Sequence, residues 1–385
     1  MEKKRHRIGI DARFYGPLGK GLGRYTQEIV DGILSIDTEN EYVIFLSKEN
    51  FDEFESTNPR VKKVLADVRW YTLREQIEMP RLIKKEKLDL MHFPHFNVPI
   101  FCPVKFVVTI HDLILTKFPT MRATTLGPFK YFIKNLGYRF GIKQGIKRAK
   151  KVIAISNYTK NDIVKTFKVR ESKIVVTYEG VANLAKGQDS RFTAKLDQRE
   201  VLSGYCILEP YLLYVGNAYP HKNLEFLIKV FKKIHATFPD LKLVLVGKKD
   251  YFYERLSLFA KEISAPSVIF PGYVPDRELE VLFSHALAYT FPSKFEGFGL
   301  PPLEAMAHGC PVISSDATCL PEVLGDAVLF ASPEKEIEWL DKIEQLVNNQ
   351  TLRSSLISKG FERVALYDWR RCAQETKEVY ERVLE

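Results

Sequence analysis

The sequence predicts an α/β protein built from two doubly wound domains, and three observations support this fold class. The chain has 385 residues, which is too long for one ordinary hydrophobic core. Short runs rich in β-branched residues alternate with helical patterns throughout, as they do in parallel βαβ units. A polar stretch without strong periodicity, residues 183–209, separates these units into two successive series.

Each series contains six candidate strands. The first set comprises residues 7–11, 42–47, 88–93, 106–110, 152–156 and 174–178, and the second comprises 212–216, 243–247, 268–271, 288–291, 312–315 and 327–330. Helical patterns lie between them, for example over 224–235 and 334–347. We therefore expect an N-terminal domain, 1–190, and a C-terminal domain, 191–368. The final segment, 369–385, is expected to form a helix that completes the second domain or returns to the first.

The composition indicates a globular protein with an anionic partner. Apolar residues make up 45% of the chain and charged residues 27%, and the formal net charge is +9. That charge fits nucleic acid, a membrane surface or a phosphorylated substrate equally well. The N-terminus lacks the apolar segment of a signal peptide, and no apolar run is long enough to span a membrane. Five scattered cysteines argue against disulfides or a zinc site, so we expect a cytoplasmic protein.

The strongest local motif follows the candidate strand 288–291 and reads FEGFGLPPLE over residues 295–304. Parallel sheets bind ligands at the carboxyl ends of their strands. Glycines let backbone amides approach a ligand closely, and a helix that opens with proline presents the positive end of its dipole. Residues of this motif predicted to contact the ligand are Glu296, Phe298, Gly299, Leu300 and Glu304. They suit a diphosphate and its sugar hydroxyls, whereas the alternative is a plain strand–helix connection.

A second glycine-rich segment, residues 19–25 (GKGLGRY), follows the first candidate strand and leads into a helical pattern over 25–34. Gly21 and Gly23 can wrap a phosphate at the start of that helix, and Arg24 can supply a cation. The spacing does not match the dinucleotide fingerprint, which disfavours NAD. A purely structural turn is the alternative interpretation.

Two pairs of polar residues end strands of the first series. His111 and Asp112 follow the strand 106–110, where a neutral imidazole can hydrogen-bond a sugar hydroxyl. His92 and His95 lie at the end of the preceding strand and are candidates for an acceptor pocket, together with Asp112. Structural packing is the alternative for each of them.

Taken together, these motifs resemble glycosyltransferase family 4, whose members have the GT-B fold of two Rossmann-like domains with an interdomain cleft. Glu296 and Glu304 are separated by seven residues, as in that family's E-x7-E motif. The other matching segments are 19–25, 111–113, 152–156 and 215–223 (VGNAYPHKN). These segments occur in the family's order and spacing, and together they extend over almost the whole chain. Within the family, the sequence is similar to bacterial polysaccharide mannosyltransferases.

The resemblance implies transfer of a hexose with retention at the anomeric carbon. Lys222 would neutralise the departing diphosphate, Glu296 would position the donor sugar, and Glu304 would bind the nucleoside ribose. His111 would face the donor sugar. Many members carry arginine where Asn217 stands, so His221 or Arg24 would have to supply the second cation.

Neither a metal ion nor a bound cofactor is expected. No Asp-x-Asp pair, which holds a divalent metal in transferases of the other main fold, occurs in the chain. Leaving-group stabilisation by Lys222 and by helix amides is the mechanism that agrees with this pattern.

A basic stretch runs from residue 113 to 161 without a single Asp or Glu, and aromatic residues are interleaved with its Lys and Arg. Such a helix can lie on an anionic membrane surface, which would suit a lipid-linked saccharide acceptor and a peripheral location on the inner face of the membrane. The alternative is a core-packing helix with a solvated basic face.

Two other functions remain open. A non-hydrolysing sugar-nucleotide epimerase shares the two-domain layout and needs no acceptor. A nucleic-acid-binding protein fits the charge but lacks the usual recognition motifs, so no nucleic-acid partner is expected. The donor is GDP-mannose or a UDP-hexose; its base and sugar, the acceptor and the oligomeric state are not determined by the sequence.

Overall fold

A computed structural model describes residues 4–117, 128–181, 197–265 and 267–385. It divides the chain into two compact units: unit 1 comprises 1–180 and 368–385, and unit 2 comprises 181–367. Each unit contains one sheet in which every strand pairing is parallel. The two doubly wound α/β domains predicted from the sequence are therefore confirmed. The boundary predicted between residues 190 and 191 lies outside the described residues.

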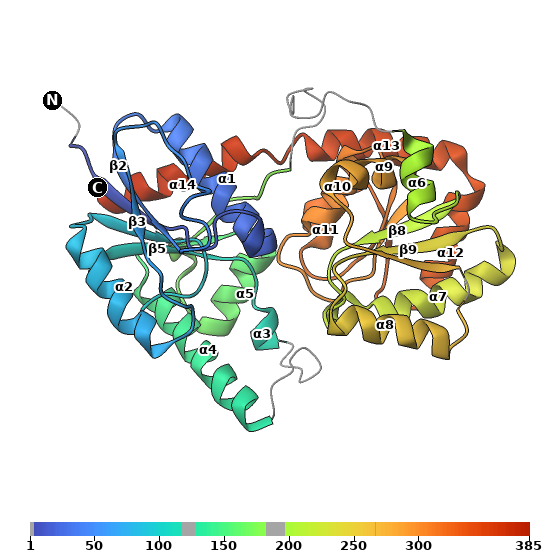
Figure 1. Ribbon diagram of the computed structural model, residues 1–385, viewed down its shortest axis with the longest axis horizontal. Helices are drawn as coiled ribbons and strands as arrows, with labels where there is room; N and C mark the ends of the chain where they lie inside the picture. The colour runs from blue at the N-terminus through green and yellow to red at the C-terminus, as the bar shows by residue number, and fades with distance from the viewer. Residues whose placement is uncertain (1–3, 118–127, 182–196, 266) are drawn as a thin grey trace. The chain divides into compact units, whose positions relative to one another are not determined.

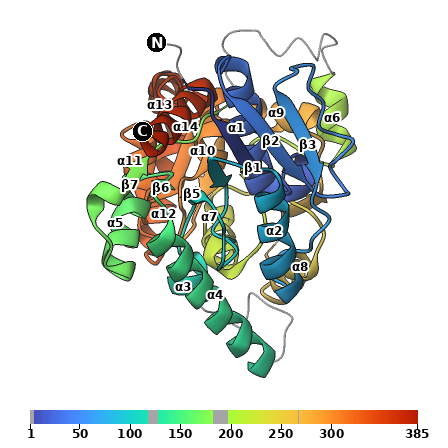
Figure 2. The same cartoon turned by 90° about the vertical axis from the view of Figure 1, so that its left-hand side faces the viewer.

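Unit 1 has a seven-stranded sheet in the order β3-β2-β1-β4-β5-β6-β7. Its strands are β1 (Arg7–Asp11), β2 (Glu41–Leu46), β3 (Val61–Leu65), β4 (Leu90–Phe93), β5 (Lys105–Ile110), β6 (Lys151–Ala154) and β7 (Ile174–Val176). Its helices are α1 (Lys20–Ile36), α2 (Leu73–Lys85), α3 (Ile114–Lys117), α4 (Pro128–Arg148), α5 (Asn157–Phe167) and α14 (Trp369–Leu384), with short 3₁₀ turns η1 (Pro17–Gly19) and η3 (Glu171–Lys173). Helices α1 and α14 cover one face of the sheet, and α2, α4 and α5 cover the other (Figures 1 and 2).

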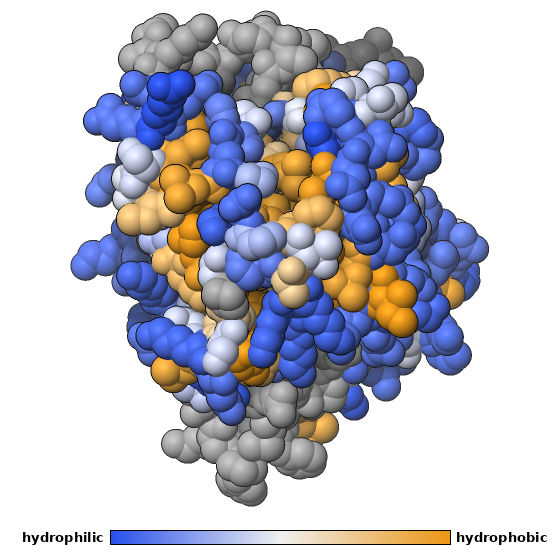
Figure 3. Space-filling view, turned by 90° about the vertical axis from the view of Figure 1, so that its right-hand side faces the viewer, coloured by the Kyte–Doolittle hydropathy of each residue, from blue (hydrophilic) through white to orange (hydrophobic). Residues whose placement is uncertain are grey.

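Unit 2 has a six-stranded sheet in the order β10-β9-β8-β11-β12-β13. Its strands are β8 (Tyr211–Val215), β9 (Lys242–Val246), β10 (Val268–Gly272), β11 (Ala288–Phe291), β12 (Val312–Ser315) and β13 (Leu329–Ala331). Its helices are α6 (Gln198–Gly204), α7 (Leu224–Thr237), α8 (Tyr251–Glu262), α9 (Asp276–His285), α10 (Leu300–Ala307), α11 (Leu320–Leu324), α12 (Glu336–Asn348) and α13 (Gln350–Val364), and the 3₁₀ turn η5 (Pro220–Lys222) precedes α7. On the face of this unit that Figure 3 shows, hydrophobic side chains form separate patches within a mainly hydrophilic surface.

Burial explains why these segments become strands. The residues of β2, β4, β8 and β11 are almost all buried, as expected for strands covered by helices on both faces. The sequence did not indicate β3, because this edge strand reads VKKVL and is largely exposed. Lysines on an edge strand protect it from pairing with another chain.

The C-terminal helix α14 belongs to unit 1 and lies along α1. A Cβ atom placed on Gly32 would lie 2.6 Å from the Ala373 methyl, so the missing side chain allows the two helices to approach closely. The buried side of α14 carries the residues that its periodicity indicated: Trp369, Ala373, Thr376, Val379, Tyr380 and Val383. The helix therefore completes the core of the first unit, although it follows the second in sequence.

The glycine-rich segment is helical rather than a loop. Helix α1 begins at Lys20, so Gly21 and Gly23 lie in its first turns. A Cβ on Gly23 would lie 2.1 Å from the carbonyl oxygen of Gly16, whereas a Cβ on Gly21 would meet no atom within 4 Å. Gly23 thus permits close packing of the helix start on the preceding turn, and Gly21 faces open space.

Candidate active site

The strand order reverses once in each sheet, next to β1 in unit 1 and next to β8 in unit 2. In doubly wound sheets this switch point, at the carboxyl ends of the strands, is where ligands bind. In unit 2 it lies between β8 and β11. The segment after β8 carries Asn217, His221 and Lys222, and the segment after β11 carries Glu296, so the sequence-predicted residues flank the switch point.

Lys222 and Glu296 form an ion pair at this edge, with 2.6 Å between Nζ and Oε1. Both side chains are nearly buried, with exposed fractions of 12% and 11%. The Lys222 ammonium also lies 5.3 Å from the centre of the Phe291 ring. Because Lys222 immediately precedes the capping residue of α7, the pair stands at the positive end of that helix. The arrangement holds a cation ready for an anionic ligand.

Hydrogen bonds join the loop that carries Glu296 to the segments that follow β8 and β12. The His221 carbonyl accepts hydrogen bonds from the Lys294 amide (2.7 Å) and the Ser293 hydroxyl (3.2 Å). On the other side, the Glu296 amide donates to Thr318 Oγ1 at 3.1 Å. These contacts keep Glu296 beside Lys222 and also exclude the His221 carbonyl from a ligand-binding role.

The His221 ring is half-buried, and its pKa falls to about 4 because of burial and the neighbouring Lys222 ammonium. It is therefore neutral near pH 7 and can donate or accept a hydrogen bond, but it does not supply a second positive charge. Asn217 accepts a hydrogen bond from the Tyr219 amide (3.2 Å), which shapes the turn after β8.

Glu304 lies on α10, eight positions after Glu296, and is half-buried. Burial raises the pKa of the Tyr289 hydroxyl well above its ordinary value, and the charges of Glu304 and Glu296 raise it further. Both carboxylates therefore act electrostatically on the same side chain of β11. Gly299, with φ of 96°, caps α10, and a Cβ there would lie 2.7 Å from the Leu320 side chain. A side chain at Gly299 would thus disturb the start of the helix beside Phe298 and Leu300.

In unit 1, His111 ends β5 and is held on both sides of its ring. Nδ1 lies 3.2 Å from Glu179 Oε1, and Nε2 lies 2.9 Å from the Pro94 carbonyl. Burial alone would lower the pKa of His111, but the hydrogen bond and charge of Glu179 outweigh it and raise this pKa above its ordinary value. The structure thus gives His111 a fixed orientation and favours its protonated form.

Glu179 was not indicated by the sequence, although it is buried and follows β7 at the carboxyl edge of the sheet. The available signal was its position, because Glu179 is a carboxylate three residues beyond the end of the short strand β7. Its partner is 68 residues away, so the pairing itself has no local signature.

Changing Glu179 to Gln tests this pair. The pKa of His111, followed by the NMR shifts of its ring protons, is expected to fall because the negative charge is removed. A histidine with a raised folded pKa contributes stability that is complete below its unfolded pKa, about 6.5, and is lost as pH rises through the folded value. The variant is expected to lose this pH-dependent stability. Asp112→Asn is the control, and it is expected to lower the pKa of His111 less. Equal falls of this pKa in both variants would contradict the assignment of Glu179 as the main partner of His111.

The remaining predicted residues of unit 1 have different surroundings. His92 is fully buried. Its Nδ1 forms a hydrogen bond of 2.6 Å with the Tyr380 hydroxyl, and its Nε2 forms one of 2.9 Å with Thr109 Oγ1. A buried ring with both nitrogens engaged has no face for an acceptor, so packing replaces the predicted acceptor contact. Asp112 accepts a hydrogen bond from the Ile114 amide and shapes the turn after His111. Arg24 is half-buried on α1.

His95 lies in a cluster of aromatic rings at the carboxyl edge of unit 1. Its ring centre is 5.4 Å from Phe14 and 3.9 Å from Phe96, and Phe14 stacks on Trp70 at 4.2 Å. These residues follow β1, β3 and β4, so the cluster stands beside the switch point of this sheet. Only His95 was singled out by the sequence, because the aromatic partners come from distant segments.

Within the described ranges, no three His, Cys, Asp or Glu side chains are grouped so that they could hold a metal ion. Over the same ranges, no helix combines the length and the hydropathy that crossing a membrane requires.

Comparisons with known proteins agree with the fold and these motifs. Residues 19–182 match the model described as Glycosyltransferase Family 4, and residues 208–363 match Glycosyl transferases group 1. The chain is 30% identical over 372 residues to O-antigen chain mannosyltransferase RfbU of Salmonella typhimurium, covering 92% of this chain and 94% of that protein. It is 27% identical to O-antigen chain mannosyltransferase B of Escherichia coli, over 94% and 95% of the two chains.

Solved structures share the architecture at low identity. Sucrose-phosphate synthase from Thermosynechococcus elongatus superposes with a TM-score of 0.75 at 19% identity, covering 98% of this chain and 99% of the other. HepE from Anabaena, solved with UDP, has a TM-score of 0.74 at 14% identity over 98% and 99% of the two chains. These matches show the GT-B fold that the sequence predicts. The chain therefore belongs to glycosyltransferase family 4 and is a hexosyltransferase.

Proposed function

We propose that the protein transfers a hexose, with retention at the anomeric carbon, from a nucleotide diphosphate sugar to a saccharide or lipid-linked saccharide. The observation that carries this proposal is the Lys222–Glu296 pair at the switch point of unit 2. GDP-mannose is the preferred donor, because relatives at 30% and 27% identity are mannosyltransferases. A UDP-hexose is the second candidate, since a protein of the same fold is solved with UDP.

In this proposal Lys222 stabilises the charge that develops on the departing diphosphate. A fixed ammonium group at a helix N-terminus suits this task, because it needs no reorganisation as the bond breaks. Donor binding would replace the contact of Lys222 with Glu296 by a contact with phosphate oxygens. Glu296 would then be available to accept hydrogen bonds from sugar hydroxyls, and Glu304 from the ribose. His221, Asn217, Phe298, Gly299 and Leu300 would line the same donor site.

We assign the acceptor to unit 1, where His95 and its aromatic neighbours stand beside the switch point. Aromatic rings offer flat apolar faces to the carbon side of a sugar ring, while the imidazole can hydrogen-bond a hydroxyl. His111, oriented by Glu179, would hydrogen-bond a hydroxyl of the donor sugar. A hydrogen bond from His111 to a sugar requires exchange of its contact with the Pro94 carbonyl.

The glycines at the start of α1 offer a separate test of donor contacts. Gly23→Ala places a methyl group against the Gly16 carbonyl and is expected to destabilise the fold by about 1–3 kcal/mol. Gly21→Ala adds a methyl group in open space and is expected to raise helix stability by up to about 1 kcal/mol. Urea denaturation measures both.

If Gly21 approaches the donor as proposed, its alanine variant also binds the sugar nucleotide more weakly although it is more stable. Unchanged binding would remove Gly21 from the donor site. A stable Gly23→Ala variant would show that the close contact with Gly16 is easily relieved.

The proposed function is tested by a thermal-shift panel of GDP-, UDP-, ADP- and dTDP-sugars on the wild type and on Glu304→Ala. A nucleotide at a hundred times its Kd is expected to stabilise the protein by about 2.7 kcal/mol, which moves Tm by a few degrees. A shift with one nucleotide family, lost in the variant, identifies the donor class. The anomeric configuration of the product, followed by NMR, tests retention. Conversion of the donor without any acceptor would indicate an epimerase instead.

A further inference from the structure

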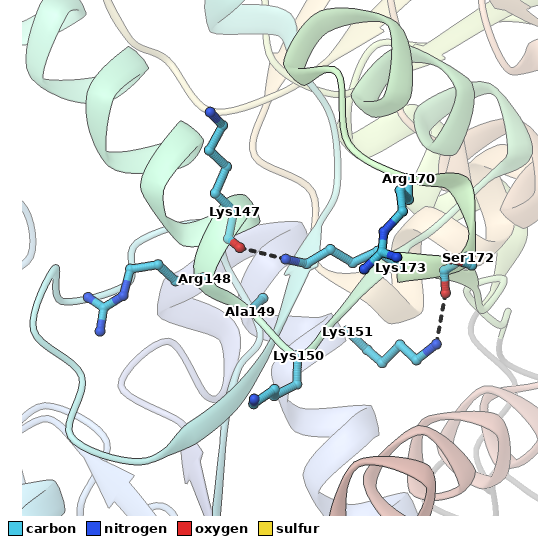
Figure 4. Close-up of a pocket in the computed structure, with 8 residues that line it drawn as sticks. All are labelled: Lys147, Arg148, Ala149, Lys150, Lys151, Arg170, Ser172 and Lys173. Atoms are coloured by element: carbon cyan, nitrogen blue, oxygen red, sulfur yellow. Dashed lines mark hydrogen bonds between the residues drawn. The ribbon is translucent and has the colours of Figure 1, made fainter.

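A basic hollow of about 360 Å³ lies in unit 1, away from the residues discussed so far. It is formed where α4 ends, where β6 begins, and at the turn η3 that precedes β7 (Figure 4). The residues that line it are Lys147, Arg148, Ala149, Lys150, Lys151, Arg170, Ser172 and Lys173. Six of these eight are Lys or Arg, and none is Asp or Glu.

Two cations of this basic hollow donate hydrogen bonds to backbone carbonyls. Lys173 Nζ donates to the Lys147 carbonyl at 2.6 Å, and Lys151 Nζ donates to the Ser172 carbonyl at 2.8 Å, as Figure 4 shows. The nearby carboxylate of Glu171 instead pairs with Lys160 at 2.9 Å. Carbonyl dipoles satisfy the ammonium protons but do not neutralise the charge.

Like charges crowd around Lys173. Burial lowers the pKa of its ammonium group, and the positive charges of Arg170 and Lys150 lower it further. Concentrating six cations on one surface costs free energy through self-repulsion. A ligand with more than one negative charge would offset that cost, and Arg170 adds the planar fork that matches a phosphate.

The basic hollow is distinct from the candidate active site. Lys151 is the first residue of β6, and Lys173 directly precedes β7. The hollow thus stands at the amino edge of the sheet, whereas His111 and Glu179 follow the carboxyl ends of β5 and β7. The two edges are separated by the length of the strands, about 3.3 Å for each residue.

We propose that this basic hollow binds a phosphate-bearing group, carried by a lipid headgroup or free in solution. The helix that ends at the hollow favours the lipid source. On α4, Leu136 and Phe140 are exposed, and Lys143 and Lys147 follow on the same side at helical spacing. Apolar side chains followed by cations suit a surface where acyl chains meet phosphate headgroups. Arg170 and Lys173 extend the charge beyond the basic stretch recognised in the sequence.

The test uses the full chain and the double variant Lys150→Glu/Arg170→Glu, because both side chains are exposed and their replacement leaves the core intact. The matched control is Lys84→Glu/Lys85→Glu, which makes the same change in net charge on exposed residues at the end of α2. One arm measures cosedimentation with phosphatidylcholine vesicles, with and without phosphatidylglycerol. The other measures binding of inorganic phosphate and pyrophosphate by calorimetry.

The double variant is expected to bind its phosphate source at least about thirtyfold more weakly, since each of the two lost cations contributes about 1 kcal/mol near an anionic surface and the two added carboxylates repel it. The control is expected to stay within a few-fold of the wild type. If the double variant loses binding only to vesicles that contain phosphatidylglycerol, the ligand is a lipid headgroup. If it loses binding of pyrophosphate, the ligand is a free phosphate. Equal binding by the double variant and its control, or no binding of either probe by the wild type, would overturn the proposal. Thermal shifts with sugar nucleotides should be the same in the wild type, the double variant and the control. A failure of the phosphate-binding proposal is therefore distinguishable from a failure of the proposed function.

Discussion

Replacing Lys222 with Met is expected to lower the turnover number for sugar transfer about a thousandfold. A positioned charge that stabilises a developing anion typically contributes two to three orders of magnitude to the rate. Lys222 is nearly buried and stands at the start of α7, where water cannot easily substitute for it. The measurement is release of the nucleoside diphosphate under saturating donor, together with calorimetric binding of the same nucleotide.

The Lys222→Met variant also leaves Glu296 without its counter-ion, so loss of stability has to be separated from loss of chemistry. The double variant Lys222→Met/Glu296→Gln removes both charges and is expected to recover most of the Tm without recovering turnover. Lys294→Met is the matched control, because this neighbouring lysine is more exposed and its ion pair with Glu334 is long, at 4.0 Å. Loss of Lys294 should leave turnover near that of the wild type. Turnover within tenfold of the wild type in Lys222→Met would refute the role of Lys222.

Replacing Arg13 with Met is expected to lower the free energy of unfolding by about 3–5 kcal/mol, the usual cost of removing one partner from a buried ion pair. The Arg13 side chain is fully buried and bonds both Asp11 and Glu75 at 2.7 Å. A third bond joins its Nη1 to the Val68 carbonyl at 2.9 Å. The network connects β1, α2 and the segment after β3, and Arg13 Cζ lies 6.0 Å from the centre of the Trp70 ring, on which Phe14 stacks.

The pH dependence of the Arg13→Met variant provides the control. Burial already raises the pKa of the Glu75 carboxyl above its ordinary value, and removing the guanidinium, whose charge and hydrogen bond lower it, is expected to raise this pKa further. Groups of this kind bind more protons when folded, so stability falls as pH rises above the unfolded pKa. The stability deficit, measured by urea denaturation, is therefore expected to shrink between pH 7 and pH 5. Arg74→Met, which removes an exposed pair with Glu78, should change stability little at any pH. A deficit independent of pH would contradict this account.

The sequence predicted most of the fold because the central strands are buried on both faces. Runs such as those of β2 and β8 are recognisable without any knowledge of their partners. The exceptions are instructive. Strand β3 carries two adjacent lysines at an exposed edge, and its pattern therefore lacks an apolar run. The start of α1 was placed too late because glycines usually mark loops, whereas Gly23 serves helix packing.

The candidate site was predictable in its positions but not in its pairings. Lys222 and Glu296 each follow a strand, which is a local property, and the sheet order brings these strands together. Their ion pair spans 74 residues, and the contact of Arg13 with Glu75 spans 62. The pairing of Glu179 with His111 likewise joins residues that are 68 positions apart. Local sequence identifies which groups reach the carboxyl edge, while their partners depend on the tertiary structure.

The assignment of α14 to unit 1 has a consequence for biosynthesis. The Tyr380 hydroxyl completes the buried hydrogen bonds of His92, and a ribosome reaches Tyr380 only after it has made all of unit 2. Unit 2 is a continuous stretch of chain and can fold as soon as it emerges, while the core around His92 must wait. During that interval the nascent first unit exposes the face of α1 that α14 later covers.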